Sequence, residues 1–101
     1  MREKQRYLVY EVLSKNKIST IKIKKELNEG LYSYLGILGL SQANVNFVDQ
    51  YSNQGIILTN SKYMHHVKAA LTLIANIDDI PVIINVKKVS GMLNKARETL
   101  K

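Results

Sequence analysis

Apolar and polar residues alternate with a period of two near the start of the chain. From residue 6 to 13, the even positions Leu8, Tyr10 and Val12 are apolar, and the odd positions are mixed. This period is typical of a strand with one face in a core. We therefore expect a strand over 6–13 with its even positions buried, and a polar turn over 14–17.

The next apolar residues recur at helical spacing. They are Leu27, Leu31, Tyr34, Leu35 and Leu38. Ser19 or Thr20 can cap the start of this helix, and Gly36 and Gly39 predict its end.

A second strand and a hairpin follow. The strand is expected over 43–51, and three of its residues are expected on one face, namely Val45, Phe47 and Tyr51. Residues 52–55 should form the hairpin turn, because Asn and Gly tolerate positive φ, and 55–59 should form the third strand.

The last third of the chain predicts a helix, a strand and a short helix. The helix is expected from Asn60–Ser61 to about Asp78–Asp79. A fourth strand over 81–89 should place Val82, Ile84 and Val86 on one face. Ser90 should then cap a final helix that runs through Lys95 and Arg97.

The order βαββαβ predicts an α+β fold of the ferredoxin-like, RRM-like type. Its antiparallel sheet carries two helices on one face, with the C-terminal helix added, and we expect 1–101 to be a single domain. The open face should carry apolar residues, so it should be covered by the terminal helix or by a partner protein. These residues are Tyr7, Val9, Val48 and Ile83.

Charge is the strongest compositional signal. The chain has 15 Lys and Arg against eight Asp and Glu, a formal charge of +7. Basic residues are absent from 26–61 and gather towards both ends of the chain. Such a surface attracts polyanions, and nucleic acid is the commonest one inside cells. If the two ends meet in the fold, they form one patch.

Several classes of site are disfavoured. The chain has no cysteine, so disulfides and thiol chemistry are excluded. His65 and His66 are adjacent on a predicted helix, where they cannot share a metal at i, i+4 spacing, and Asp78–Asp79 reads as a turn. Since no acid–base pair is recognisable, we expect no intrinsic catalytic activity, no cofactor and no metal site. Without a visible signal segment or membrane helix, we expect a soluble cytoplasmic protein.

RNA contact is expected through phosphates rather than stacked bases. The third strand lacks the aromatic residues with which RNA-recognition motifs stack bases on the sheet. The start of a helix capped by Ser90 could also be a phosphate site, although an ordinary cap is compatible with the same residues. The residues predicted to contact RNA are Lys4, Arg6, Lys87, Lys88, Ser90, Gly91, Lys95 and Arg97.

Ordered segments along nearly the whole chain resemble one family, that of archaeal ribonuclease P protein component 2 and the eukaryotic Pop5-type subunits. These segments are Arg6–Val12, Tyr34-Leu35-Gly36, Gly55-Ile56-Ile57, Val67–Ile74 and Val86–Met92. The sequence departs from the family at Met92, where threonine is usual, and at Leu58-Thr59, where a basic residue is common.

The resemblance implies a subunit that braces a catalytic RNA while that RNA removes the 5′ leader of precursor tRNA. It implies magnesium at the RNA and not at this chain. It also implies ribonuclease P protein component 3 as partner, indirect contact with precursor tRNA, and room for a homodimer within a heterotetramer.

Two other hypotheses stay open from the residues alone. One is a non-enzymatic oligomerising module that associates through its sheet and whose basic charge is incidental. The other, less favoured, is a small enzyme of ferredoxin-like fold.

Overall fold

Ten elements make up residues 4–100, the part of the chain that the computed structural model describes. They are β1 (Gln5–Leu13), α1 (Thr20–Ala43), β2 (Asn46–Tyr51), β3 (Gln54–Asn60), the 3₁₀ turn η1 (Ser61–Tyr63), α2 (Met64–Leu73), β4 (Asn76–Ile77), β5 (Ile80–Pro81), β6 (Ile83–Ser90) and α3 (Leu93–Thr99).

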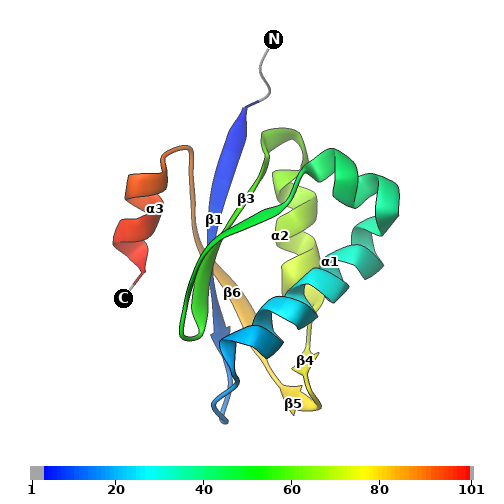
Figure 1. Cartoon of the computed structure of the whole chain (residues 1–101), viewed down its shortest axis with the longest axis vertical. Coiled ribbons are helices and arrows are strands. Elements are labelled where there is room, and N and C mark those ends of the chain that lie inside the picture. The colour runs from blue at the N-terminus through cyan, green and yellow to red at the C-terminus, as the bar shows by residue number, and fades with distance from the viewer. Residues whose placement is uncertain (1–3, 101) are drawn as a thin grey trace.

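The main sheet has the strand order β2-β3-β1-β6, and every neighbouring pair is antiparallel. Helices α1 and α2 lie together on one side of it, and α3 lies on the other side (Figure 1). The predicted α+β arrangement is confirmed. The sequence did not predict the small hairpin of β4 and β5 between α2 and β6.

The predicted faces of β1 are also confirmed. Leu8, Tyr10 and Val12 are buried in the main core against α1 and α2. On the opposite face, Val9 is completely buried with Ile56 and Ala96 in a second apolar cluster. Because Ala96 belongs to α3, the terminal helix covers this part of the sheet.

Both long helices end elsewhere than predicted. Helix α1 does not stop at Gly36, but is interrupted there and continues to Ala43. Helix α2 ends at Leu73, five residues before Asp78. Asp78 and Asp79 have φ values of 53° and 64° and form the two-residue turn of the β4–β5 hairpin, so the turn itself was predicted correctly.

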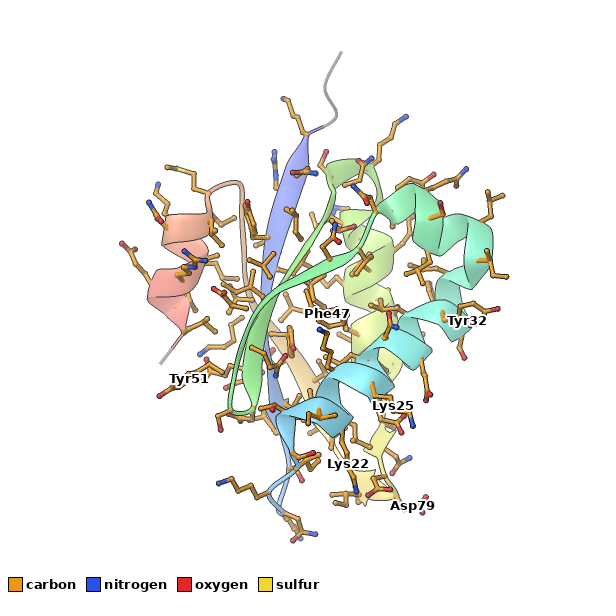
Figure 2. All side chains as sticks on the ribbon, viewed as in Figure 1. Lys22, Lys25, Tyr32, Phe47, Tyr51 and Asp79 are labelled. Atoms are coloured by element: carbon orange, nitrogen blue, oxygen red, sulfur yellow. The ribbon has the colours of Figure 1, made fainter. Side chains whose placement is uncertain are left out.

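The prediction that Tyr51 shares a face with Phe47 is wrong. A β-bulge shifts the pairing, because Phe47 lies opposite Ile57 and Asp49 lies opposite Ile56. The extra residue, Val48, exchanges the two faces beyond it. Figure 2 shows Phe47 on the side of α1 and Tyr51 pointing to the opposite side, towards the C-terminal end of α3.

The hairpin between β2 and β3 is tighter than predicted. Its turn is Ser52–Asn53, and Ser52 has the positive φ, 54°. Gly55 belongs to β3 instead of the turn. A Cβ on Gly55 would lie 2.6 Å from Cζ of Tyr10, so this glycine is required by a close side chain.

The last strand begins later than predicted, because Pro81 belongs to β5 and β6 starts at Ile83. Val82 and Ile84 are buried, as expected. Ile83 faces the opposite way and is 67% exposed, so α3 covers only part of the open face. Within residues 4–100, no helix is long and apolar enough to cross a membrane.

Candidate nucleic-acid interface

The pairing of β1 with β6 joins the two basic ends of the chain. Tyr7, near the start of β1, lies opposite Ser90, the last residue of β6. The Arg6 guanidinium is close to the next residue, since a Cβ built on Gly91 would lie 3.5 Å from its Nη1. The start of β1 and the connection from β6 to α3 therefore lie at the same end of the sheet (Figure 1).

Two consecutive lysines lie on β6, an edge strand of the sheet. Val9 faces Lys88 and Tyr10 faces Val86, so Lys87 is the extra residue of a second bulge. Both lysines are exposed, and Lys87 Nζ lies 3.5 Å from the carbonyl oxygen of Thr99. We define the basic edge as these two lysines together with Lys4, Arg6 and Lys95.

One further lysine extends this surface and was missed. The amide of Ser61 donates a hydrogen bond of 2.8 Å to the carbonyl oxygen of Lys4, which places exposed Lys62 near the start of β1. Lys4 and Lys62 are close because Gln5 of β1 pairs with Asn60 of β3. Lys62 is far from the chain ends in sequence, so the charge pattern alone gave no signal for it.

The prediction that Ser90 caps the final helix is wrong. The N-cap is Met92, and no side chain caps the helix. The Ser90 hydroxyl accepts a hydrogen bond of 3.0 Å from the Met92 amide and donates one of 3.1 Å to the Met92 carbonyl. Since Ser90 is only 9% exposed, its hydroxyl stabilises the turn before α3.

Arg97 lies apart from the basic edge. Its Nε donates to Oδ2 of Asp49 at 2.8 Å, which links the end of α3 to β2 on the far edge of the sheet. The hydrogen bond and charge of Asp49 raise the pKa of the Arg97 guanidinium. Arg97 therefore stays charged, with part of its hydrogen-bonding capacity used by Asp49.

Among residues 4–100, few carboxylates oppose the basic edge. Glu11 lies further along β1, where it accepts a hydrogen bond from Asn85 at 3.5 Å. Glu98 is exposed on α3. Within this described part of the chain, the cations of the edge outnumber these carboxylates, which favours a positive potential at this end of the sheet.

Other charged groups lie on the helices and at the β4–β5 turn. His65 and His66 lie on a helix, as predicted, and both are exposed there on α2. Lys22 forms an ion pair with Asp78 that joins α1 to the β4–β5 turn and lowers the pKa of the Asp78 carboxyl. No group of three or more His, Cys, Asp or Glu residues within 4–100 could hold a metal ion.

The chain matches the model of a known protein family along nearly its whole length. The family model described as the Rpp14/Pop5 family matches residues 6–101. The chain belongs to the Rpp14/Pop5 family. The resemblance inferred from the sequence segments is therefore confirmed.

Its curated relatives have a consistent name. Ribonuclease P protein component 2 of Thermococcus kodakarensis is 30% identical over 99 residues, which are 96% of this chain and 82% of the relative. The protein of the same name from Methanocaldococcus jannaschii is 30% identical, over 96% of this chain and 72% of the relative. This chain is a homologue of ribonuclease P protein component 2.

A solved structure shows the same fold. A chain in the cryo-EM structure of yeast ribonuclease MRP superposes with a TM-score of 0.73, covering 99% of this chain and 88% of that one. Sequence identity is 15%, so the likeness concerns the arrangement of sheet and helices.

Proposed function

We propose that this chain is a protein subunit of ribonuclease P, which braces the catalytic RNA during removal of the 5′ leader from precursor tRNA. The observation that carries the proposal is the whole-length relationship to ribonuclease P protein component 2. In this role the chain supplies no catalytic group, and magnesium is held by the RNA. Precursor tRNA is contacted only indirectly.

The basic edge is the proposed RNA-binding surface. Its five side chains come from β1, β6, α3 and the residue that precedes β1, and Lys62 extends it. Lys and Arg side chains bind phosphates without reading base sequence, which suits a protein that stabilises a folded RNA. Ser90 and Gly91 contribute through the tight turn that positions the basic residues around them.

A protein partner is proposed for a different region. The second half of α1 exposes the apolar side chains of Ile37 and Leu38, each 71% exposed. This helix lies on the opposite side of the sheet from α3 (Figure 1). We propose that ribonuclease P protein component 3 binds this chain, and that two copies can join in a heterotetramer.

Reconstitution tests the function. The chain is mixed with the cognate catalytic RNA, protein component 3 and precursor tRNA, and cleavage is measured at low magnesium. Faster cleavage in the presence of the chain is expected. Self-association that is insensitive to salt, together with no RNA retention, would support the oligomerising module instead, which the exposed apolar residues favour as second candidate.

Charge removal tests the surface. The triple change Lys87→Gln, Lys88→Gln and Lys95→Gln should flatten the log–log salt dependence of RNA binding by about one unit for each phosphate that is no longer neutralised. All three lysines are exposed, so the fold should be unaffected.

A matched triple change controls for total charge. This control variant removes the same charge from exposed positions in and after the β1–α1 loop. Its substitutions are Lys15→Gln, Lys17→Gln and Lys25→Gln. Its salt slope should stay close to that of the unchanged protein. Equal slopes for both triple variants would contradict the assignment of binding to the basic edge.

A further inference from the structure

A hollow lies between the end of β2 and the C-terminal end of α3. It has a volume of about 460 Å³ and is lined by Asp49, Gln50, Tyr51, Arg97 and Leu100. The Tyr51 side chain is 61% exposed within this lining. The volume falls in the range of roughly 300–1,000 Å³ that is usual for small-molecule sites.

The β2 bulge puts Tyr51 in this position. Without the extra residue Val48, strand alternation would place Tyr51 on the α1 side with Phe47. With it, Tyr51 projects to the side of α3 (Figure 2). Asp49 lies on the same side, where it forms an ion pair with Arg97 of α3. Tyr51 and Arg97 therefore line the same hollow, next to the edge strand β2.

The hollow combines an exposed aromatic face with a fixed cation. Asp49 binds Arg97 through Nε, which holds the guanidinium at the rim. The Gln50 side chain is directed to the other face, where Tyr10 donates a hydrogen bond to its Oε1. A flat heteroaromatic ring could stack on Tyr51 while an attached phosphate approaches the guanidinium.

We propose that this hollow binds an unpaired nucleobase of RNA, stacked on Tyr51. The proposal rests on the proposed function, since that function supplies RNA as the ligand. The position also suits a polynucleotide, because a lysine of the basic edge lies at the same end of α3. Nζ of Lys87 is 3.5 Å from the carbonyl oxygen of Thr99. The backbone of a single strand could thus contact Arg97 and continue to the basic edge.

Three single substitutions, each made in the full-length protein, test whether a base stacks on Tyr51. Binding of a short single-stranded oligoadenylate is measured for Tyr51→Leu, Tyr51→Phe and the matched control Tyr32→Leu. Tyr32 is also exposed, but it lies on α1. Tyr51→Leu should lose roughly 10- to 100-fold in affinity, whereas Tyr51→Phe and Tyr32→Leu should bind nearly as the unchanged protein does. The salt slope of Tyr51→Leu should be unchanged, because stacking releases no counterions.

A fluorescence measurement gives a direct readout. The chain has no tryptophan, so Tyr51→Trp introduces a single indole whose emission can be followed alone. Oligoadenylate should quench it, whereas an abasic oligonucleotide of equal length should not. Tryptophan introduced by Tyr32→Trp should respond to neither.

Several outcomes would overturn the nucleobase site. These are unchanged oligoadenylate affinity in Tyr51→Leu, equal quenching of the Tyr51→Trp variant by the abasic strand, and a response of that variant to protein component 3 without RNA. If the catalytic RNA still binds through the basic edge, only the nucleobase site fails. If the unchanged protein binds no RNA, the proposed function fails with it.

Discussion

Tyr10 joins three strands through a single side chain. It is completely buried on β1, its ring lies over Gly55 of β3, and its hydroxyl donates a hydrogen bond to Oε1 of Gln50 on β2. The row Tyr10–Gly55–Gln50 is a line of direct pairing partners across the sheet. The glycine therefore has no space for a side chain.

Tyr10→Phe should lower the free energy of unfolding by about 1 kcal/mol, because the partly buried oxygen of Gln50 loses its donor. Urea denaturation measures the change. Tyr32→Phe removes a hydroxyl from a half-exposed ring and should leave the midpoint unchanged. Equal urea midpoints for the two variants would show that the Tyr10–Gln50 hydrogen bond contributes nothing to the free energy of unfolding.

The same hydroxyl affects stability in alkali. Burial raises the pKa of Tyr10 well above its ordinary value, and the hydrogen bond to Gln50 opposes this in part. Since the folded pKa exceeds the unfolded value of about 10, the contribution of Tyr10 is complete below about pH 10 and is lost as pH rises. The stability advantage over Tyr10→Phe should therefore be constant up to about pH 9 and shrink as pH is raised above about 10.

At the scale of elements, two local irregularities shape the surfaces. The bulge at Val48 turns Tyr51 to the α3 side, and the bulge at Lys87 lies in the basic edge. Helix α1 has a third irregularity at Gly36, where φ is 74° and ψ is 177°. Only glycine adopts this conformation readily.

Gly36→Ala should cost about 1–3 kcal/mol in unfolding free energy. A Cβ at Gly36 would meet no other atom within 4 Å, so the cost comes from the backbone alone. Gly39→Ala is the matched control in the helical part of α1. At Gly39, alanine gains helix propensity, but its Cβ would lie 3.2 Å from Cβ of Leu35. These effects oppose each other, so a much smaller change in unfolding free energy is expected. A midpoint for Gly36→Ala equal to that of the unchanged protein would show that α1 can run straight through this position.

At the scale of the whole molecule, helices cover one face of the sheet and part of the other. The larger core lies beneath α1 and α2, and a small cluster of Val9, Ile56 and Ala96 lies beneath α3. Helix α3 has seven residues, too few to be stable alone. Its position therefore depends on this cluster and on the link from Arg97 to Asp49.

Ala96→Asp should detach α3, because an unpaired charge would be buried against Val9 and Ile56. A loss of at least about 2 kcal/mol is expected, with increased binding of a hydrophobic dye and self-association on size-exclusion chromatography. Asn94→Asp adds the same charge at an exposed position of α3. This variant should keep its stability, bind no more dye and show no self-association. Identical behaviour of the two variants would mean that α3 does not protect the sheet.

The sequence by itself determined the order of the main-sheet strands and the three helices, the buried face of β1 and the basic character of both ends. These features depend on local periodicity and composition, which any stretch of chain displays without its neighbours. The same information misplaced the end of α1, the cap of α3 and the face of Tyr51. Each depends on a backbone irregularity that has no periodic signature.

Only the tertiary structure decided which distant residues meet. Pairing of β1 with β6 gathers Arg6 and Gly91, and pairing of β1 with β3 brings Lys62 near Lys4. Docking of α3 brings Arg97 into the lining of the same hollow as Tyr51. Strand register and helix docking minimise the free energy of the whole assembly of side chains, so the surfaces proposed to bind RNA exist only once the chain has folded.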